Sequence, residues 1–186
     1  KDSGLNDLTN MIGFNFRMTE MSAAVGLEQL KKIENLVKIR ENIALKLNDG
    51  LDGLDGIRMP IQRDNTRAVY YMYQMQFDPE TIGVKREVFC KALEAEGFPT
   101  FVGYVEPLYL LPMLQKRIAF GNNGYPFNLS NQKYDKGICP VAERLHEESL
   151  IGFDCCTLEV KDHQIDLLIE AFRKVHKHKD DLKQIN

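Results

Sequence analysis

The chain has 186 residues, of which 44% are hydrophobic and 27% are charged, and its formal net charge at pH 7 is -3. This length and hydrophobic content suffice for a folded domain with a buried core, which excludes a disordered chain. The near balance of acidic and basic residues excludes the basic surface of a nucleic-acid-binding protein, and no stretch approaches the roughly 20 apolar residues of a membrane span. Since the first residues also lack the apolar core of a signal peptide, we expect a cytoplasmic protein whose partners include neither nucleic acid nor membrane.

The cysteines and histidines do not form a metal-binding pattern. No C-x-x-C pair occurs, and adjacent Cys155 and Cys156 are poorly placed to bond each other or to share one zinc ion. We interpret Cys90, Cys139 and this adjacent pair as reduced, mostly buried thiols, with a disulfide or a metal site as the alternative. Surface positions without metal are expected for His146, His163, His176 and His178.

The chain begins with a polar lead-in, residues 1–12, which we expect to be a loop or a frayed end. A long helix is predicted from Thr19, an N-cap residue, to Leu51. From Leu30 onward its apolar residues recur every three, four or seven positions, and with two earlier residues they form one stripe: Ala24, Val25, Leu30, Ile33, Val37, Ala44, Leu47 and Leu51. The stripe fits packing within the chain and a dimer contact equally well, and the glycines that follow Asp49 are expected to end the helix.

A strand is predicted over residues 69–77, which are rich in β-branched and aromatic residues. Tyr70, Tyr71 and Tyr73 could form a stacking platform for bases or sugars, but their place within a strand favours packing in a sheet. An amphipathic helix over 85–97 and a strand over 98–104 follow. The prolines of segment 106–113 exclude one continuous helix there.

Residues 121–138 contain three glycines and four asparagines, which predicts a long surface loop. Pro140 suits the first position of a helix over 141–150, and a strand over 152–158 and a helix over 161–178 complete the chain. The basic residues at the end of that last helix complement its dipole. We therefore predict a single α/β (α+β) domain over residues 1–186, with a small, mostly antiparallel sheet flanked by helices.

A polar cluster precedes the long helix: Asn15, Arg17, Thr19 and Glu20 follow Gly13. A helix N-terminus with amide, hydroxyl and guanidinium donors suits a phosphate or carboxylate ligand. Ordinary capping of the helix, with Arg17 paired to a nearby acid, explains the same residues.

The stretch from Gly13 to Leu30 reads G-F-N-F-R-M-T-E-M-S-A-A-V-G-L-E-Q-L. It resembles the G-x-N-[YF]-R-M-[TS]-E-x-x-A-A-x-G-x-x-Q-L motif of the DegT/StrS family of nucleotide-sugar aminotransferases, which depend on pyridoxal 5'-phosphate (PLP). Phe16 stands where the family usually has tyrosine, so a role for that hydroxyl is lost. Residues 85–100, 104–112 and 139–143 resemble further family segments in the same order, although Tyr109 replaces the common histidine.

The resemblance implies the small C-terminal domain of a fold-type I PLP enzyme, with a homodimer and a nucleotide-sugar or cyclitol substrate. In the family the motif asparagine reaches across the dimer to the PLP phosphate, which implies a cofactor-binding role for Asn15 and, at the same interface, for Arg17. The segment from Tyr104 to Tyr109 matches the substrate side of the family's site, which makes these two tyrosines substrate-binding candidates.

The lysine that holds PLP and the acid at its pyridine nitrogen lie upstream of this motif in the family. We therefore expect the large PLP-binding domain to be absent from residues 1–186, and the chain alone to carry no catalytic residue, to bind no PLP and to be inactive. In the intact enzyme an amino group from glutamate or glutamine would pass to a keto-sugar in polysaccharide or amino-sugar biosynthesis. The alternative is a non-catalytic dimerisation or interaction domain derived from that family.

Overall fold

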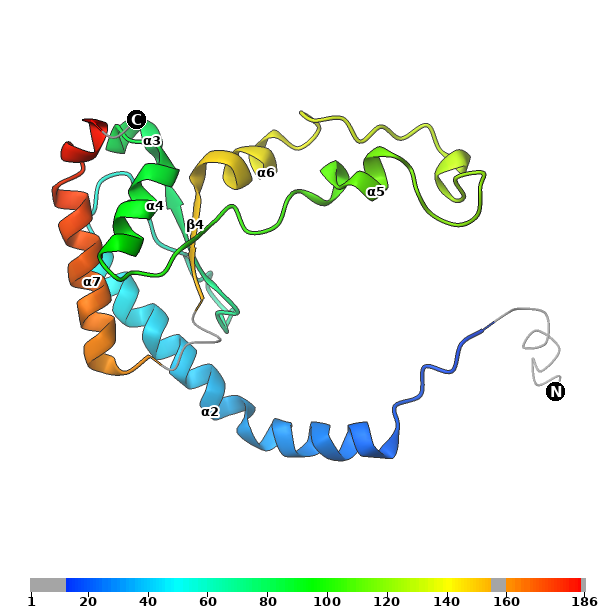
Figure 1. The fold of residues 1–186 in the computed structure, drawn as a ribbon. Coiled ribbons are helices and arrows are strands. Elements are labelled where there is room, and N and C mark those ends of the chain that lie inside the picture. The colour runs from blue at the N-terminus through cyan, green and yellow to red at the C-terminus, as the bar shows by residue number, and fades with distance from the viewer. Residues whose placement is uncertain (1–12, 155–159, 185–186) are drawn as a thin grey trace. The chain divides into compact units, whose positions relative to one another are not determined.

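The computed structural model describes residues 13–154 and 160–184. The chain divides into two units, one ending at Leu36 and one beginning at Val37, and each is described by itself. Helix α2 (Glu20–Leu51) begins in the first unit and ends in the second (Figure 1). The predicted N-terminal loop over 1–12 and the adjacent Cys155 and Cys156 lie outside the described residues.

In the first unit, residues 13–19 have no regular secondary structure and lead into α2. The Thr19 hydroxyl accepts a hydrogen bond from the backbone N–H of Ser22 at 3.2 Å, which confirms the predicted N-cap. The predicted apolar stripe is not buried in this half of the helix, because Val25, Leu30 and Ile33 remain 63%, 63% and 52% exposed.

The second half of α2 buries its apolar face in the second unit. Val37, Ala44, Leu47 and Leu51 are buried as the stripe predicts, and Ile43 joins them. The helix ends at Leu51 as predicted, and Gly53 just beyond it adopts a left-handed φ of 75°.

Helix α7 (Asp162–Lys177) contacts the C-terminal end of α2 through Arg173. The Arg173 Nε donates to the carbonyl of Gly50 at 2.5 Å, and its Nη2 donates to that of Asp52 at 3.1 Å. This arginine therefore satisfies carbonyls at the end of α2 and just beyond it. Lys174 and Lys177 lie in the last turn of α7, where the sequence predicts basic residues.

Four short strands form one antiparallel sheet in the order β1–β2–β4–β3. Met75 lies opposite Ile151 in the central pair, and Val102 lies opposite Ile151 on its other side. The strands are β1 (Ile57–Arg58), β2 (Tyr73–Phe77), β3 (Phe101–Val102) and β4 (Leu150–Phe153). This small antiparallel sheet with flanking helices confirms the predicted fold class.

The predicted strands are longer than the observed ones. Tyr70 and Tyr104 adopt left-handed φ values of 46° and 57°, which cannot continue an extended strand, so β2 starts after the first and β3 ends before the second. The last strand begins at Leu150 rather than Gly152, and residues 155–158 of that prediction lie outside the described residues. Tyr73 is fully buried and its hydroxyl donates to Asn48 Oδ1 at 2.6 Å, so this tyrosine serves sheet packing.

The remaining helices follow the predicted order with one correction. The helices predicted over 85–97 and 161–178 are observed with slightly shorter bounds. The helix predicted over 141–150 is instead a short α-helix that starts at Pro140 and runs into the π-helical segment η3 (Leu145–Ser149), after which Leu150 enters β4. The other helices are α3 (Pro79–Ile82), α4 (Arg86–Ala95), α5 (Pro112–Gln115) and α6 (Pro140–Arg144).

A chain of aromatic rings joins the helices to the sheet. Phe89 of α4 lies 5.2 Å from Phe77 of β2 and 5.6 Å from Phe172 of α7, measured between ring centroids. Phe98 continues the chain at 5.4 Å from both Phe172 and Phe153 of β4. All five rings are almost fully buried, and edge-to-face or tilted packing at these distances favours one arrangement of α4, α7 and the sheet.

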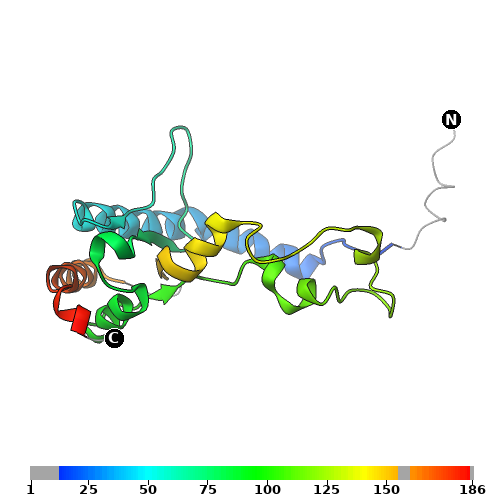
Figure 2. The same ribbon diagram turned by 90° about the horizontal axis from the view of Figure 1, so that it is seen from above.

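The segment between β3 and α6 extends away from the sheet in both views (Figures 1 and 2). It contains the 3-10 turns η1 (Leu108–Leu110) and η2 (Phe127–Leu129) besides α5, while a further turn, η4 (Asp181–Gln184), follows α7. Residues 121–138 are largely exposed, which confirms the predicted surface loop. Leu111 interrupts the helical conformation between η1 and α5, as the prolines predicted.

Among the described thiols, Cys90 is buried and Cys139 is exposed, so the prediction of mostly buried cysteines holds for the first and is wrong for the second. Burial raises the pKa of the Cys90 thiol to about 11. None of the helices in the described ranges has the length and apolar character that crossing a membrane requires.

Candidate functional site

Asn15 and Arg17 form a local pair in the first unit. The Asn15 Oδ1 accepts hydrogen bonds from the backbone N–H and the Nε of Arg17, at 3.2 and 3.1 Å. Both side chains are exposed, and the Nδ2 of Asn15 and the Nη groups of Arg17 have no acceptor within the described residues. The pair therefore presents uncommitted donors of the kind that bind phosphate.

Residues 103–109 contain both tyrosines that the resemblance implicates in substrate binding. Gly103 and Tyr104 adopt consecutive left-handed φ values of 67° and 57°, which turn the chain away from β3. The Tyr104 ring is 48% exposed and lies 6.2 Å from the Phe101 ring. A non-glycine residue at positive φ is strained, so this turn depends on its surroundings.

Tyr109 lies at the other end of this segment and contacts α6. Its hydroxyl donates a hydrogen bond to Glu143 Oε1, which also accepts the backbone N–H of Gly137 at 2.6 Å. The hydrogen bonds from Tyr109 and Gly137 hold the pKa of the Glu143 carboxyl below its usual range. Burial, together with the carboxylate, raises the pKa of Tyr109 to about 12.

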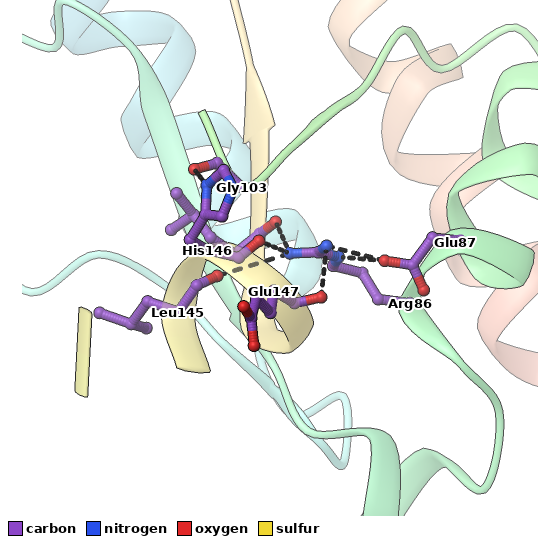
Figure 3. A network of polar contacts seen from close by, with 7 residues as sticks. Arg86, Glu87, Gly103, Leu145, His146 and Glu147 are labelled. Carbon is purple, nitrogen blue, oxygen red and sulfur yellow. Dashed lines mark hydrogen bonds and ion pairs between the residues drawn. The ribbon is translucent and has the colours of Figure 1, made fainter. Parts of the chain in front are cut away.

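The segment η3 is anchored by Arg86, the first residue of α4 (Figure 3). The guanidinium donates to the carbonyls of His146 at 2.8 Å and Glu147 at 2.7 Å, and also reaches those of Leu145 and Leu150. It is 5% exposed, and Glu87 supplies its carboxylate partner at 2.7 Å. This buried arginine ties η3 to α4 by satisfying carbonyls that a π-helical turn leaves free.

His146 links η3 to the turn at Gly103. Its Nδ1 lies 2.8 Å from the Gly103 carbonyl oxygen, and the ring is half-buried rather than at the surface as predicted. His163 and His178 are exposed, as predicted, whereas His176 is half-buried and its Nε2 lies 2.8 Å from the Asp55 carbonyl oxygen. Within residues 13–154 and 160–184, no group of three or more His, Cys, Asp and Glu side chains could hold a metal ion.

The sequence pattern did not single out Arg86, Glu143 or His146 as site residues. Arginine and glutamate on helices usually face solvent, so nothing local distinguishes these two from their charged neighbours. Two signals were available for Glu143: residues 139–143 resemble a family segment, and Pro140 fixes the start of α6 and hence places Glu143 in its first turn. The structure joins Asn15 to Arg17, and Tyr109 to Glu143, but these two pairs lie in different units.

A family model for the DegT/DnrJ/EryC1/StrS aminotransferase family matches residues 2–151. The chain belongs to this family. Its members are PLP-dependent aminotransferases, which agrees with the resemblance found from the motifs.

Two relatives illustrate the match to the DegT/DnrJ/EryC1/StrS family. The spore coat polysaccharide biosynthesis protein SpsC of Bacillus subtilis is 30% identical over 115 residues, which cover 61% of this chain and 29% of SpsC. A Streptoalloteichus tenebrarius protein is 27% identical over 183 residues, covering 93% of this chain and 42% of its own length. That protein carries the provisional name L-glutamine:3-amino-2,3-dideoxy-scyllo-inosose aminotransferase.

The fold matches solved aminotransferases. The structure of DesV from S. venezuelae, in complex with a ketimine intermediate, aligns with a TM-score of 0.67 at 22% identity, over 90% of this chain and 39% of DesV. A Psychrobacter cryohalolentis aminotransferase aligns with the same TM-score at 20% identity, over 91% of this chain and 42% of that structure. The chain thus spans less than half the length of these relatives.

The donors at Asn15 and Arg17 fit the phosphate of PLP chemically, because an amide N–H and a guanidinium both donate to a phosphate dianion. The described residues do not include an enclosed lysine that could carry PLP. Every lysine among them is at least partly exposed, whereas a lysine that carries PLP is normally enclosed beside it.

Proposed function

We propose that this chain is the C-terminal part of a PLP-dependent aminotransferase that moves an amino group from glutamate or glutamine to a keto-sugar or cyclitol. The observation that carries the proposal is the family match over residues 2–151, together with a relative named for glutamine-dependent amination of a cyclitol. The Spore coat relative, named for polysaccharide biosynthesis, supports a sugar-related pathway. The proposal places the large PLP-binding domain outside residues 1–186 and the intact enzyme in the cytoplasm.

In this proposal Asn15 and Arg17 bind the phosphate of a PLP molecule held by the other subunit of a homodimer. PLP itself would carry the amino group and act as the electron sink. The role of the two side chains is to orient and retain the cofactor through charge-assisted hydrogen bonds. Their exposure and their free donors support this assignment.

Residues 104–109 form one wall of the proposed substrate site. Tyr104 offers a half-exposed aromatic face and hydroxyl, which suits stacking and hydrogen bonding to a sugar or cyclitol ring. Tyr109 has its hydroxyl proton committed to Glu143, so its oxygen remains an acceptor for a substrate hydroxyl.

The decisive experiment compares the chain alone with the protein encoded by its full genomic reading frame. Each is incubated with PLP, glutamine or glutamate and a panel of nucleotide-linked keto-sugars and keto-cyclitols, and amino product is measured by mass spectrometry. We expect turnover with the longer protein only. If the reading frame encodes no PLP-binding domain, or the longer protein aminates none of the panel, the proposal is wrong.

A second candidate function, a non-catalytic dimerisation domain, is favoured by the exposed apolar side chains of the first unit. Met21, Val25, Leu27 and Leu30 are each more than 60% exposed, which is unusual for a helix that has no partner. Sedimentation velocity at rising concentration tests this candidate. Self-association that Val25→Glu and Leu30→Glu abolish, in a chain with no upstream catalytic domain, would favour it over the aminotransferase.

A further inference from the structure

Both ends of the segment 103–109 contact one short helical element. At one end, the His146 ring meets the Gly103 carbonyl at 2.8 Å, and at the other the Tyr109 hydroxyl donates to Glu143. Glu143 and His146 are three positions apart along the continuous stretch formed by α6 and η3, a spacing that brings helical side chains to one face. We propose that Glu143 and His146 are positioning residues that hold segment 103–109 in its conformation. Only the role of this segment in substrate binding rests on the proposed function.

The contact at Gly103 indicates which ring nitrogen of His146 carries a hydrogen. A carbonyl oxygen only accepts hydrogen bonds, so the Nδ1 of His146 must carry a hydrogen, in the neutral ring or in the imidazolium. A Cβ at Gly103 would lie 2.3 Å from the His146 carbonyl oxygen, which shows how closely the two backbones approach. The ring thus holds the residue that immediately precedes the strained Tyr104.

The contact at Tyr109 is equally well defined. Glu143 is 7% exposed, and its Oε1 accepts from both Tyr109 and the backbone of Gly137. The Gln115 amide adds a second restraint, because its Nε2 donates to the carbonyls of Tyr109 and Tyr134 at 2.6 Å each. The carboxylate consequently fixes Tyr109 relative both to α6 and to the loop that contains Gly137.

The element that carries these two residues is itself fixed to the protein interior by Arg86. Its guanidinium donates to the carbonyl of His146 at 2.8 Å, while the ring of the same histidine reaches Gly103 (Figure 3). Hydrogen bonds therefore connect α4 to η3, and η3 to the turn at Gly103. Such outer support is what keeps a binding loop in a productive geometry.

Matched substitutions of His146 test the contact with the Gly103 carbonyl. In His146→Asn the side-chain amide can donate from a position close to that of Nδ1, whereas in His146→Gln it mimics Nε2 and cannot reach in the same way. Amide hydrogen exchange is measured on the chain at Gly103, whose N–H bonds to Leu150, and at Leu110, whose N–H bonds to Pro107. We expect His146→Ala and His146→Gln to speed exchange at Gly103 by about tenfold, and His146→Asn to restore protection.

Substitutions of Glu143 test the contact with Tyr109 by the same measurement. Glu143→Ala should speed exchange at Leu110 by about tenfold and affect Gly103 less, while Glu143→Gln keeps an acceptor oxygen and should stay near the parent rate. Amides of α7 serve as the internal control and should not change. Equal acceleration in α7 would overturn the proposal, because the substitutions would then lower global stability. Unaltered exchange at Gly103 and Leu110 would also overturn it, because the two residues would then not restrain the segment.

The full-length aminotransferase separates this inference from the proposed function. There, His146→Gln should raise KM for the keto-sugar by roughly tenfold with kcat within about twofold, and His146→Asn should recover the parent KM. If exchange at Gly103 responds but KM does not, the positioning by His146 stands and the assignment of residues 104–109 to the substrate site is wrong.

Discussion

The ring of Phe101 in β3 lies directly over Gly152 in β4. The two residues are register partners, and a Cβ at Gly152 would fall 1.8 Å from the Cζ of Phe101. Glycine is required here because the aromatic ring occupies the space of a side chain on this face of the sheet. This contact fixes how the edge strand β3, and with it the turn at Gly103, sits on the sheet.

We therefore expect Gly152→Ala to destabilise the chain by about 1 to 3 kcal/mol, the usual cost of overpacking. Urea denaturation followed by circular dichroism measures the change. A double-mutant cycle supplies the control, because Phe101→Ala removes the ring that the new methyl group would meet. The prediction is wrong if Gly152→Ala costs as much in the Phe101→Ala background as in the parent.

The contact between Tyr109 and Glu143 should give the protein a characteristic tyrosine titration. Burial, assisted by the carboxylate, raises the pKa of Tyr109 from 10.0 to about 12. Because this pKa is raised in the folded state, the stabilisation is complete below about pH 10 and is lost as the pH rises through about 12. The absorbance of tyrosinate near 295 nm, compared with that of Tyr109→Phe, isolates this group among the seven tyrosines.

Glu143→Gln provides the matched control for that titration, since it removes the charge and keeps an acceptor. The pKa of Tyr109 should fall toward 10.0 but remain above it, because burial is the larger cause of its shift. A pKa unchanged by Glu143→Gln would show that the carboxylate does not contact the hydroxyl in solution.

The sequence predicted the parts of the fold that depend on local periodicity. The cap at Thr19, the buried half of α2 and the helix α7 follow from apolar spacing and capping residues, which act within a few turns. Strand ends were predicted less well. Tyr70 and Tyr104 have high strand propensity, and only their tertiary surroundings place them at positive φ.

The candidate site likewise has a part that the sequence could predict and a part that it could not. The motif around Asn15 is contiguous, so a resemblance of residues could find it. The restraints on residues 103–109 and on η3 join Arg86, Glu143 and His146 to residues that are between 34 and 64 positions away. Such contacts leave no periodic pattern, and the usual expectation that charged residues face solvent misses a buried arginine.

Arg86 should be important for stability because its guanidinium satisfies several carbonyls of the η3 region at once. Arg86→Met keeps much of the apolar stem but leaves those buried acceptors unpaired, and we expect a loss of at least about 2 kcal/mol in the free energy of unfolding. Arg63→Met, at an exposed side chain, is the control and should change stability by less than about 0.5 kcal/mol. Equal urea midpoints for the two variants would contradict the role assigned to Arg86.

Asn15→Ala tests the proposed role of the first unit in cofactor binding. In the full-length enzyme, loss of a hydrogen bond to the phosphate dianion should raise the dissociation constant for PLP by about tenfold to a hundredfold. Folding and dimerisation should be nearly unaffected, because the side chain is exposed and its hydrogen bonds to described residues are those with the nearby Arg17. PLP retention after dialysis is measured by absorbance, and the dimer by sedimentation. Asn42→Ala, at an exposed position of α2, is the matched control, and PLP affinity equal to that of this control, with the dimer intact, would remove Asn15 from the cofactor site.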